Sequence, residues 1–200
     1  MSPRYFLVFK PYGVVCRFGK EAGKTTLGDL LTGLPRDAYP LGRLDEKSEG
    51  LLIISNDKSL HRFYSDPGKA PEKEYLVFLD GRPDPEKFER IASGMEISIK
   101  GKKVPTLPCR IMLLPEEMKS LIPPAELPIM KRAPEKTCWV VVQLNEGKNR
   151  QIRRMFGMEG LPALRIIRTR IGKLKSEGML PGDLREISAA AARSGLGIKA

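Results

Sequence analysis

An aspartate in a charged loop is the strongest candidate for a chemical role in this chain. Asp45 follows the turn-forming residues Pro40 and Gly42 and precedes the apolar run 51–54, so it is expected on a loop between two strands. A carboxylate in such a place can act as a nucleophile or as a general base. Glu49 is near enough in sequence to complete a glycosidase-like acid and base pair, although paired carboxylates occur in any charged loop.

A second polar segment, EGKNRQIRRM at residues 146–155, supplies the cations that a buried carboxylate needs. Desolvation in a closed cleft raises the pKa of a carboxyl group and neutralises it, so a neighbouring cation must keep it ionised. Arg153 is the candidate for this partner of Asp45. The alternative for Arg153 is an ordinary arginine on a helix surface. Arg150 and Arg154 are expected to contact phosphate.

The charge balance indicates a polyanionic ligand. The 200 residues include 35 Lys and Arg against 24 Asp and Glu, a net charge of +11. The excess is concentrated in residues 131–175, where twelve cations face three acids and alternate with apolar residues. A surface that follows a nucleic-acid backbone explains this pattern better than an ordinary solvated face. It does not suit the neutral sugar that a glycosidase would bind.

The two polar segments resemble the signatures of the RsuA family of ribosomal RNA pseudouridine synthases. That family carries G-R-L-D followed by S-x-G-L-L, as in GRLDEKSEGLL at residues 42–52, and later a Q-I/V-R element, as at 151–153. The resemblance runs from FLVFKP at 6–11 to GDLR at 182–185, essentially the whole chain. It implies isomerisation of uridine to pseudouridine in ribosomal RNA, with 23S RNA as the expected substrate and no cofactor or metal.

The resemblance also gives catalytic roles to three residues. Asp45 corresponds to the family's indispensable aspartate, and Arg153 to the arginine that pairs with it. Tyr75, in a K-x-Y element at 73–75, would pack against the target base, and its hydroxyl would be placed for proton transfer. Whether Asp45 attacks the sugar, attacks the base or removes a sugar proton is left open.

Other residues are implied to bind the substrate. Arg43 would fill the gap left by the flipped nucleotide or bind phosphate, and Arg150 and Arg154 would bind phosphate. Ile167 would line the uracil pocket, beside Arg168 in a basic strand.

Two other functions compete with this interpretation. A non-catalytic ribosomal RNA-binding or assembly protein would explain the charge equally well, but a carboxylate facing phosphate weakens binding unless Asp45 does chemistry. The segment GKEAGKT at 19–25 is similar to a P-loop, yet it has three residues between its glycines where the Walker pattern has four. It is therefore interpreted as a flexible basic loop.

The hydrophobic pattern predicts the elements that must position these residues. Strands are expected at 4–9, 39–44, 51–55, 72–79, 137–144, 163–171 and 183–187, and helices at 25–31, 57–65, 84–93 and 150–158. Asn149 is expected to cap the last of these helices. Five prolines between residues 114 and 134 predict an irregular insertion or an exposed hairpin.

Irregular alternation of strands and helices favours an α+β protein with a mixed, mostly antiparallel central sheet. The resemblance implies the pseudouridine synthase fold, with flanking helices and a catalytic cleft. One catalytic domain is expected over residues 1–200, with a finer division into two sublobes at about 1–66 and 67–200. No S4 domain is expected, as in the short members of the family.

The remaining composition excludes several classes. Cys16, Cys109 and Cys138 lack metal-ligand spacing and an even count, so neither a disulfide framework nor a zinc site is indicated. His61 is the only histidine, which argues against a Ser-His-Asp triad. No apolar run approaches the ~20 residues that span a bilayer, and the N-terminus lacks a signal sequence. A cytoplasmic monomer without membrane contact is expected.

Overall fold

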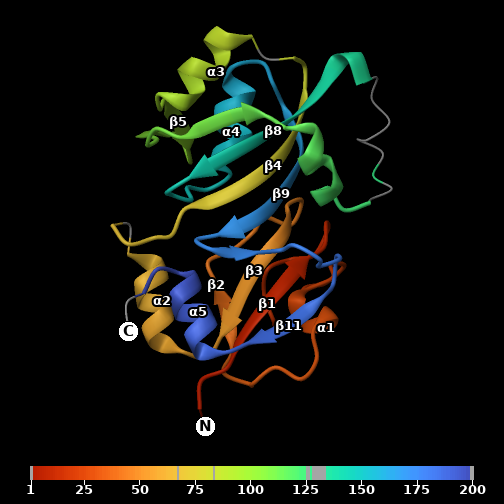
Figure 1. Ribbon diagram of the computed structural model, residues 1–200, viewed down its shortest axis with the longest axis vertical. Coiled ribbons are helices and arrows are strands. Elements are labelled where there is room, and N and C mark those ends of the chain that lie inside the picture. The colour runs from red at the N-terminus through yellow and green to blue at the C-terminus, as the bar shows by residue number, and fades with distance from the viewer. Residues whose placement is uncertain (1, 67, 83, 125–126, 128–133, 199–200) are drawn as a thin grey trace. The chain divides into compact units, whose positions relative to one another are not determined.

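Two units make up the chain in the computed structural model, which describes all residues except 1, 67, 83, 125–126, 128–133 and 199–200 (Figure 1). Unit 1 comprises Met1–Pro71 and Ile167–Ala200, and unit 2 comprises Glu72–Ile166. This division differs from the expected sublobes at about 1–66 and 67–200, because residues 167–200 return to the first unit.

Unit 1 is an α+β unit built on antiparallel strands. Its elements are β1 (Tyr5–Lys10), α1 (Leu27–Leu30), β2 (Tyr39–Leu41), β3 (Glu49–Ser55), α2 (Lys58–Ser65), β10 (Leu174–Lys175), β11 (Leu184–Ile187) and α5 (Ala189–Gly195). The strand β9 (Ala163–Ile171) enters it from residue 167 onward. The strand order is β11-β1-β3-β9, with β2 on β3 and β10 on β9. Because β3 and β9 are parallel while the other pairs are antiparallel, the sheet is mixed, as expected.

Both faces of the unit 1 sheet are covered. Every residue of β1 and β3 is buried, which requires near-continuous apolar runs like FLVF and LLII. Since side chains alternate along a strand, Phe6 and Val8 share one face and pack with Leu27 of α1. On the opposite face the hydroxyl of Tyr5 donates to Asp57 at 2.7 Å, at the start of α2.

Short side-chain caps fix the helices of unit 1. The carboxylate of Asp29 accepts from the backbone N–H and the hydroxyl of Thr26 at the start of α1. The carboxylate of Asp57 accepts from the N–H of Ser59 at 2.8 Å and so caps α2. In Figure 1, α2 and α5 lie side by side although they are far apart in sequence, and Arg193 of α5 lies 3.5 Å from Asp57.

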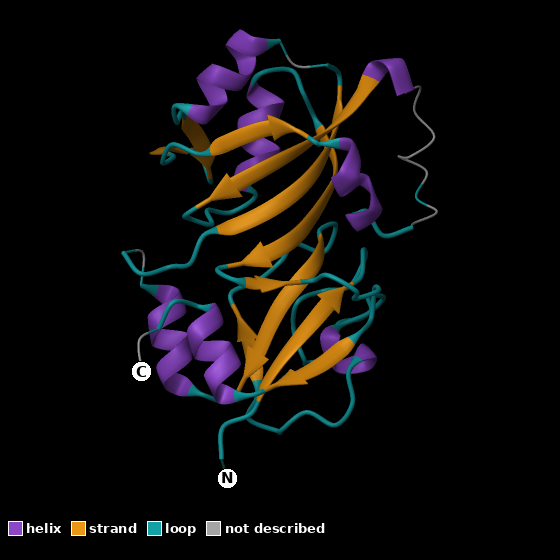
Figure 2. Cartoon of the chain, in the orientation of Figure 1, coloured by secondary structure: helices purple, strands orange, loops and turns teal. Residues whose placement is uncertain are grey.

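Unit 2 contains antiparallel strands with helices beside them, as Figure 2 shows. Its strands are β4 (Lys73–Asp80), β5 (Glu96–Ile99), β6 (Lys102–Pro105), β7 (Arg110–Leu113), β8 (Thr137–Leu144) and the first part of β9. Its helices are α3 (Pro85–Ala92), α4 (Gln151–Met158) and the 3-10 turns η1 (Glu116–Leu121) and η3 (Pro134–Lys136). β8 pairs with β4 and β7, whereas β5 and β6 form a separate hairpin.

The expected cap of α4 is wrong in one respect. The helix begins at Gln151, and its N-cap is Arg150 in the left-handed conformation, with φ 52°. The side chain of Asn149 does not cap the helix, because its Oδ1 accepts from the guanidinium of Arg154 at 3.3 Å. The Gln151 side chain instead folds back and accepts from the N–H of Lys148 at 3.0 Å.

The proline-rich segment 114–134 is only partly described. It contains the 3-10 turn η1, in agreement with the irregular structure expected there, while residues 125–126 and 128–133 lie outside the described residues. Arg165 is almost completely buried and donates to the carbonyl of Pro123 at 3.0 Å, which anchors the described end of the segment.

The structure also bears on the three cysteines and on whether a helix could cross a membrane. Cys16, Cys109 and Cys138 are all free thiols. Within the described ranges, no helix has the length and apolar character needed to cross a bilayer.

Candidate active site

Asp45 lies on the loop between β2 and β3, as the sequence predicts. The N–H of Ser48 donates to the carbonyl of Asp45 at 3.0 Å, so the residues after Asp45 form a tight turn. The Asp45 side chain is half-buried, whereas Ser48 and Glu49 are buried as the chain enters β3. The carboxylate therefore lies where the chain passes from solvent into the sheet.

Two glycines hold the ends of this loop. Gly42 has φ +70°, and a Cβ added there would lie 2.7 Å from the Tyr64 ring. Gly50 has φ +101°, and its Cβ would lie 2.2 Å from the carbonyl oxygen of Arg168. L-residues with a side chain avoid these backbone angles, and at Gly50 the obstacle is backbone that cannot rotate away. The two glycines of the GRLD and SEGLL elements thus fix the path of the loop.

Lys10 is a part of the site that sequence reasoning missed. It ends the apolar strand β1, is 0% exposed, and its Nζ donates to the carbonyls of Val14 at 2.6 Å, Pro11 at 2.9 Å and Glu46 at 3.3 Å. Burial lowers the pKa of Lys10 to about 8, and the nearby carboxylates, Asp45 among them, act in the opposite direction. The sequence signal was a charged residue at the end of a fully apolar strand.

Glu46 ties the loop to the turns that follow β1. Its carbonyl also accepts from the N–H of Gly13 at 2.9 Å, and its carboxylate lies 3.0 Å from Nζ of Lys24. Lys24 belongs to the GKEAGKT segment and also lies 3.2 Å from Glu21. That segment therefore contacts the Asp45 loop through the Lys24–Glu46 ion pair.

The basic strand β9 lies next to the end of the Asp45 loop. In the parallel register Glu49 is opposite Ile167 and Gly50 is opposite Arg168. Ile167 is fully buried. Arg168 is 3% exposed, and its Nε donates to the carbonyl of Leu51 at 2.7 Å. Arg168 thus crosslinks β9 to β3 directly after the loop. Arg43, two residues before Asp45, is exposed.

Tyr75 belongs to unit 2, on strand β4 opposite Val142 of β8. It is 7% exposed and shares a face of β4 with Val77 and Leu79. Phe78, on the other face, stacks on Trp139 with ring centroids 5.0 Å apart. Tyr75 is therefore a buried residue of the unit 2 sheet.

The motif helix α4 carries the predicted arginines. Ile152, Met155 and Phe156 form its buried face. Arg153 is half-buried, and its Nη1 donates to the carbonyl of Ala163 at 2.6 Å, just where β9 begins. The arginine is thereby oriented toward the start of the strand that carries Ile167 and Arg168.

Arg150 and Arg154 differ in their surroundings. Arg150 is exposed at the left-handed N-cap of α4. The guanidinium of Arg154 donates to the carbonyl of Asn149 at 3.0 Å and to the carbonyl of Ser98, on β5, at 2.6 Å. Arg154 therefore links the motif helix to the β5–β6 hairpin.

A half-buried acid, Glu146, organises the loop that precedes α4. The carboxylate of Glu146 accepts from the side-chain amide of Gln151 at 2.6 Å and from the N–H of Leu107 at 2.8 Å, and it forms an ion pair with Lys148. These contacts make the EGKNRQ segment a rigid loop. Burial also lowers the pKa of Lys148.

The sequence-predicted residues fall into two groups. Unit 1 contains Arg43, Asp45, Ile167 and Arg168, and unit 2 contains Tyr75, Arg150, Arg153 and Arg154. In unit 1 the Asp45 loop lies next to Arg168. In unit 2 Arg150 and the guanidinium of Arg154 lie at the start of α4. The pairing of Asp45 with Arg153 joins the two units and stays a prediction.

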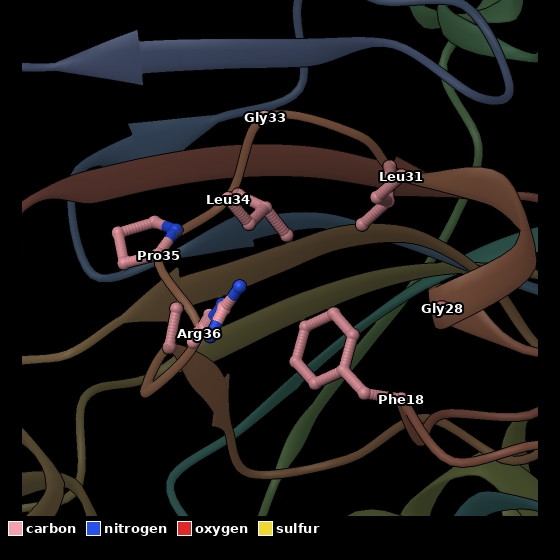
Figure 3. Close-up of a pocket in the computed structure, with 8 residues that line it drawn as sticks. Phe18, Gly28, Leu31, Gly33, Leu34, Pro35 and Arg36 are labelled. Atoms are coloured by element: carbon pink, nitrogen blue, oxygen red, sulfur yellow. The ribbon is translucent and has the colours of Figure 1, made fainter.

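A small pocket in unit 1 is a separate feature (Figure 3). It has a volume of about 250 Å³ and is lined mainly by apolar side chains, among them Phe18, Leu31 and Leu34. Leu31 belongs to the core cluster on the α1 face of the sheet, and Phe18 and Leu34 pack against that cluster. The pocket is therefore the outer edge of that core, and it contains none of the predicted site residues.

No group of three or more His, Cys, Asp and Glu side chains within the described parts of the chain is arranged to hold a metal ion. The chemistry that these residues themselves can supply is that of a carboxylate, Asp45, with a buried lysine beside it. Such a carboxylate can act as a nucleophile or as a base.

Comparison with known proteins identifies the family. Residues 4–157 match the family described as RNA pseudouridylate synthase. The chain is 35% identical over 189 residues to "Ribosomal large subunit pseudouridine synthase E" of Xanthomonas campestris pv. campestris, covering 94% of this chain and 97% of that protein. It is 29% identical over 187 residues to "Ribosomal large subunit pseudouridine synthase B" of Bacillus subtilis, covering 94% of this chain and 69% of that protein.

A solved structure shows the same fold. The structure described as "Crystal structure of pseudouridylate synthase" superposes with a TM-score of 0.76 at 24% identity, covering 98% of this chain and 74% of that one. The α+β fold with a mixed sheet is thus the pseudouridine synthase fold that the sequence predicts. The chain belongs to the RNA pseudouridylate synthase family. It is an RNA pseudouridine synthase enzyme.

Proposed function

We propose that this enzyme converts a specific uridine of large-subunit ribosomal RNA, the 23S RNA, to pseudouridine, with Asp45 as the catalytic carboxylate. The observation that carries the substrate is the 35% identity, over nearly the full length of both chains, to a relative named as a ribosomal large subunit synthase. The net charge of +11 supports an RNA ligand.

The reaction is an isomerisation and needs no co-reactant. The bond between N1 of uracil and C1′ of ribose breaks, a bond between C5 and C1′ forms, C5 loses a proton and N1 gains one. A carboxylate near the sugar and a site that holds the detached base are sufficient for these steps. Asp45, on a loop held by two glycines and by Lys10, supplies the carboxylate.

The other predicted residues have supporting roles in this proposal. Arg153 keeps Asp45 ionised, and Tyr75 stacks on the flipped base, with its hydroxyl placed for proton transfer. Ile167 lines the uracil pocket. Arg43, which is exposed, fills the space of the flipped nucleotide or contacts phosphate, and the exposed Arg150 contacts phosphate.

Two of the predicted substrate-binding arginines have structural partners that suit a positioning role. Arg168 holds β9 against β3 through its hydrogen bond to the carbonyl of Leu51. We therefore propose that Arg168 positions the Asp45 loop. Arg154 is bonded to Asn149 and Ser98, which suits the same kind of role on α4. We also propose that the enzyme acts as a cytoplasmic monomer, for which sedimentation should return the mass of one 22.3 kDa chain.

The test is to map pseudouridine in 23S RNA after incubation with the wild-type protein and with Asp45→Asn. Asp45→Asn should bind the RNA as tightly as wild type and form no pseudouridine, because the amide can neither attack nor accept a proton. Asp37→Asn, which changes an exposed carboxylate of the same unit, is the matched control and should keep full activity. Arg153→Ala should slow the chemical step far more than it weakens RNA binding.

Three other results would change the proposed function or the proposed roles. Pseudouridine formed at the wild-type rate by Asp45→Asn would remove Asp45 from the mechanism. A wild-type protein that binds 23S RNA but forms no pseudouridine in it would favour the non-catalytic role in ribosome assembly. If Arg153→Ala loses affinity and activity equally, and its binding depends less steeply on salt, Arg153 is a phosphate contact.

A further inference from the structure

The β5–β6 hairpin of unit 2 exposes a cluster of lysines that the proposed reaction does not use. β5 pairs with β6 so that Ile99 is opposite Lys102, which leaves Lys100 and Gly101 as a two-residue turn. Both turn residues are left-handed, with φ 50° and 78°, as a type I′ turn requires. Lys100, Lys102 and Lys103 thus lie within four residues at the tip of the hairpin, and all three are exposed.

The charge of this hairpin is strongly unbalanced. Residues 96–105 contain three lysines and one acid, Glu96. Lys103 lies 3.5 Å from Glu96, but both side chains are mostly exposed, at 82% and 61%, so water and salt screen this pair. The tip therefore presents a net positive charge to solvent.

The hairpin is firmly attached to the rest of unit 2. Ile97 is fully buried, and at the open end of the hairpin the N–H of Thr106 donates to the carbonyl of Met95 at 2.8 Å. The hydroxyl of Thr106 also accepts from the N–H of Met95 at 2.9 Å. The lysines are thus displayed on a rigid arm.

Arg154 connects this arm to the motif helix. Its Nη1 donates to the carbonyl of Ser98 on β5, while its Nε and Nη2 bond to the carbonyl and the side chain of Asn149. Figure 1 places β5 beside α4, in agreement with the contacts between these elements. Asn149 is followed by the exposed Arg150, so one guanidinium fixes the lysine tip relative to the helix start that carries Arg150.

We propose that the β5–β6 hairpin is an RNA-binding arm that contacts backbone phosphates through Lys100, Lys102 and Lys103, and that Arg154 is the positioning residue that holds it against α4. The proposal rests on the RNA substrate of the proposed function. If these lysines only kept the protein soluble, the hairpin would not need the Arg154 hydrogen bond that joins it to α4. Lysines without aromatic neighbours at the tip suit phosphates, which carry the sequence-independent part of RNA binding.

The test compares two triple variants with equal loss of charge. The arm variant is Lys100→Gln/Lys102→Gln/Lys103→Gln. The control is Lys58→Gln/Lys69→Gln/Lys119→Gln, which removes three lysines outside the hairpin. Affinity for a 23S RNA fragment is measured over a range of salt concentrations. The logarithmic salt dependence of the arm variant should be shallower by roughly 2, since each phosphate contact to single-stranded RNA contributes about 0.7.

The control variant should keep the wild-type salt dependence. If the arm variant keeps it too, or both triples reduce it equally, the arm is not a specific RNA contact and the proposal fails. Pseudouridine formation by the wild type is followed on the same RNA. If the wild type forms no pseudouridine while only the arm variant shows a reduced slope, the proposed reaction is contradicted, but the proposal that the hairpin binds RNA stands.

A second measurement tests the positioning role of Arg154. Arg154→Gln should speed amide hydrogen exchange in residues 96–105 and should add little to the salt effect of the arm triple, because both changes act on the same arm. If exchange is unchanged and Arg154→Gln lowers the slope by a further 0.7 or so on top of the triple, Arg154 contacts phosphate directly and its assignment as a positioning residue is overturned.

Discussion

A lysine with no solvent contact holds the loop that carries the proposed catalytic carboxylate. Lys10 donates to three backbone carbonyls, one of them that of Glu46, next to Asp45. Its burial lowers its pKa from an ordinary 10.5 to about 8. Between about pH 8 and 10.5 the unfolded chain keeps a proton that the folded chain has lost, so the free energy of unfolding should rise with pH across this window.

The variant Lys10→Met isolates this effect. A pKa shift of this size is worth at most about 3 kcal/mol. The free energy of unfolding of the wild type minus that of Lys10→Met should therefore increase by up to that amount from pH 8 to 10.5. Groups that titrate in the opposite sense, such as Cys109 with a pKa raised to about 11 by burial, cancel in the difference. Urea unfolding at several pH values measures it, and a flat difference would mean that Lys10 titrates normally.

Tyr75 offers a second test at the residue scale. Tyr75→Phe keeps the ring that we propose to stack on the flipped uracil, whereas Tyr75→Leu removes both the ring and the hydroxyl. Phe should bind the target RNA as tightly as Tyr, and Leu should lose about 1–3 kcal/mol of base contact. If the hydroxyl also moves a proton, Tyr75→Phe should bind normally and stall during turnover. Wild-type single-turnover rates for both variants would make Tyr75 a core residue only.

At the scale of elements, the close approach of β3 to β9 depends on Gly50. Gly50→Ala would place a Cβ 2.2 Å from the carbonyl oxygen of Arg168, at a backbone angle of φ +101°. We expect it to lower the free energy of unfolding by clearly more than 1 kcal/mol, on the order of a strained substitution. Gly157→Ala is the control, because no atom lies within 4 Å of its added Cβ and it lies within α4. It should raise stability by about 0.5–1 kcal/mol. Equal denaturation midpoints for the two variants would contradict the close approach.

The elements that could be predicted from the sequence are those whose local pattern is strong. β1, β3 and β8 are apolar on both faces or rich in β-branched residues, and α2 and α3 are capped by Asp57 and Asp84, whose side chains accept backbone N–H bonds. The two-residue strand β10 was missed because it carries no period that a pattern can show. The cap at Asn149 was misassigned because a distant partner, Arg154, occupies its side chain.

The same distinction applies to the site. Asp45 was placed correctly between two strands because turn residues and an apolar run enclose it. The hydrogen-bond partners of Lys10 and Arg168 could not be predicted, since each is a carbonyl that folding brings close: that of Glu46 for Lys10 and that of Leu51 for Arg168. Sequence shows which side chains carry charge, but not which backbone oxygens will lie beside them.

At the scale of the whole molecule, the division into units could not be read from local patterns. Unit 1 is discontinuous, because residues 167–200 join residues 1–71 through pairs such as Tyr5 with Ile187. Pairings over such long sequence separations cost loop-closure entropy before any contact repays it. The expected division at about 1–66 and 67–200 therefore lacks the second boundary, which lies at residue 167.

The discontinuity of unit 1 sets an order for synthesis on the ribosome. β1 is made before unit 2, whereas its neighbour β11 is made only after all of unit 2. Until then the β1 edge, with its unpaired backbone groups and apolar side chains, can associate with other nascent chains. Unit 2, continuous in sequence, can fold in the meantime. The segment that carries the proposed catalytic aspartate thus reaches its final environment only after residues 167–200 have been made, and the enzyme cannot become active before then.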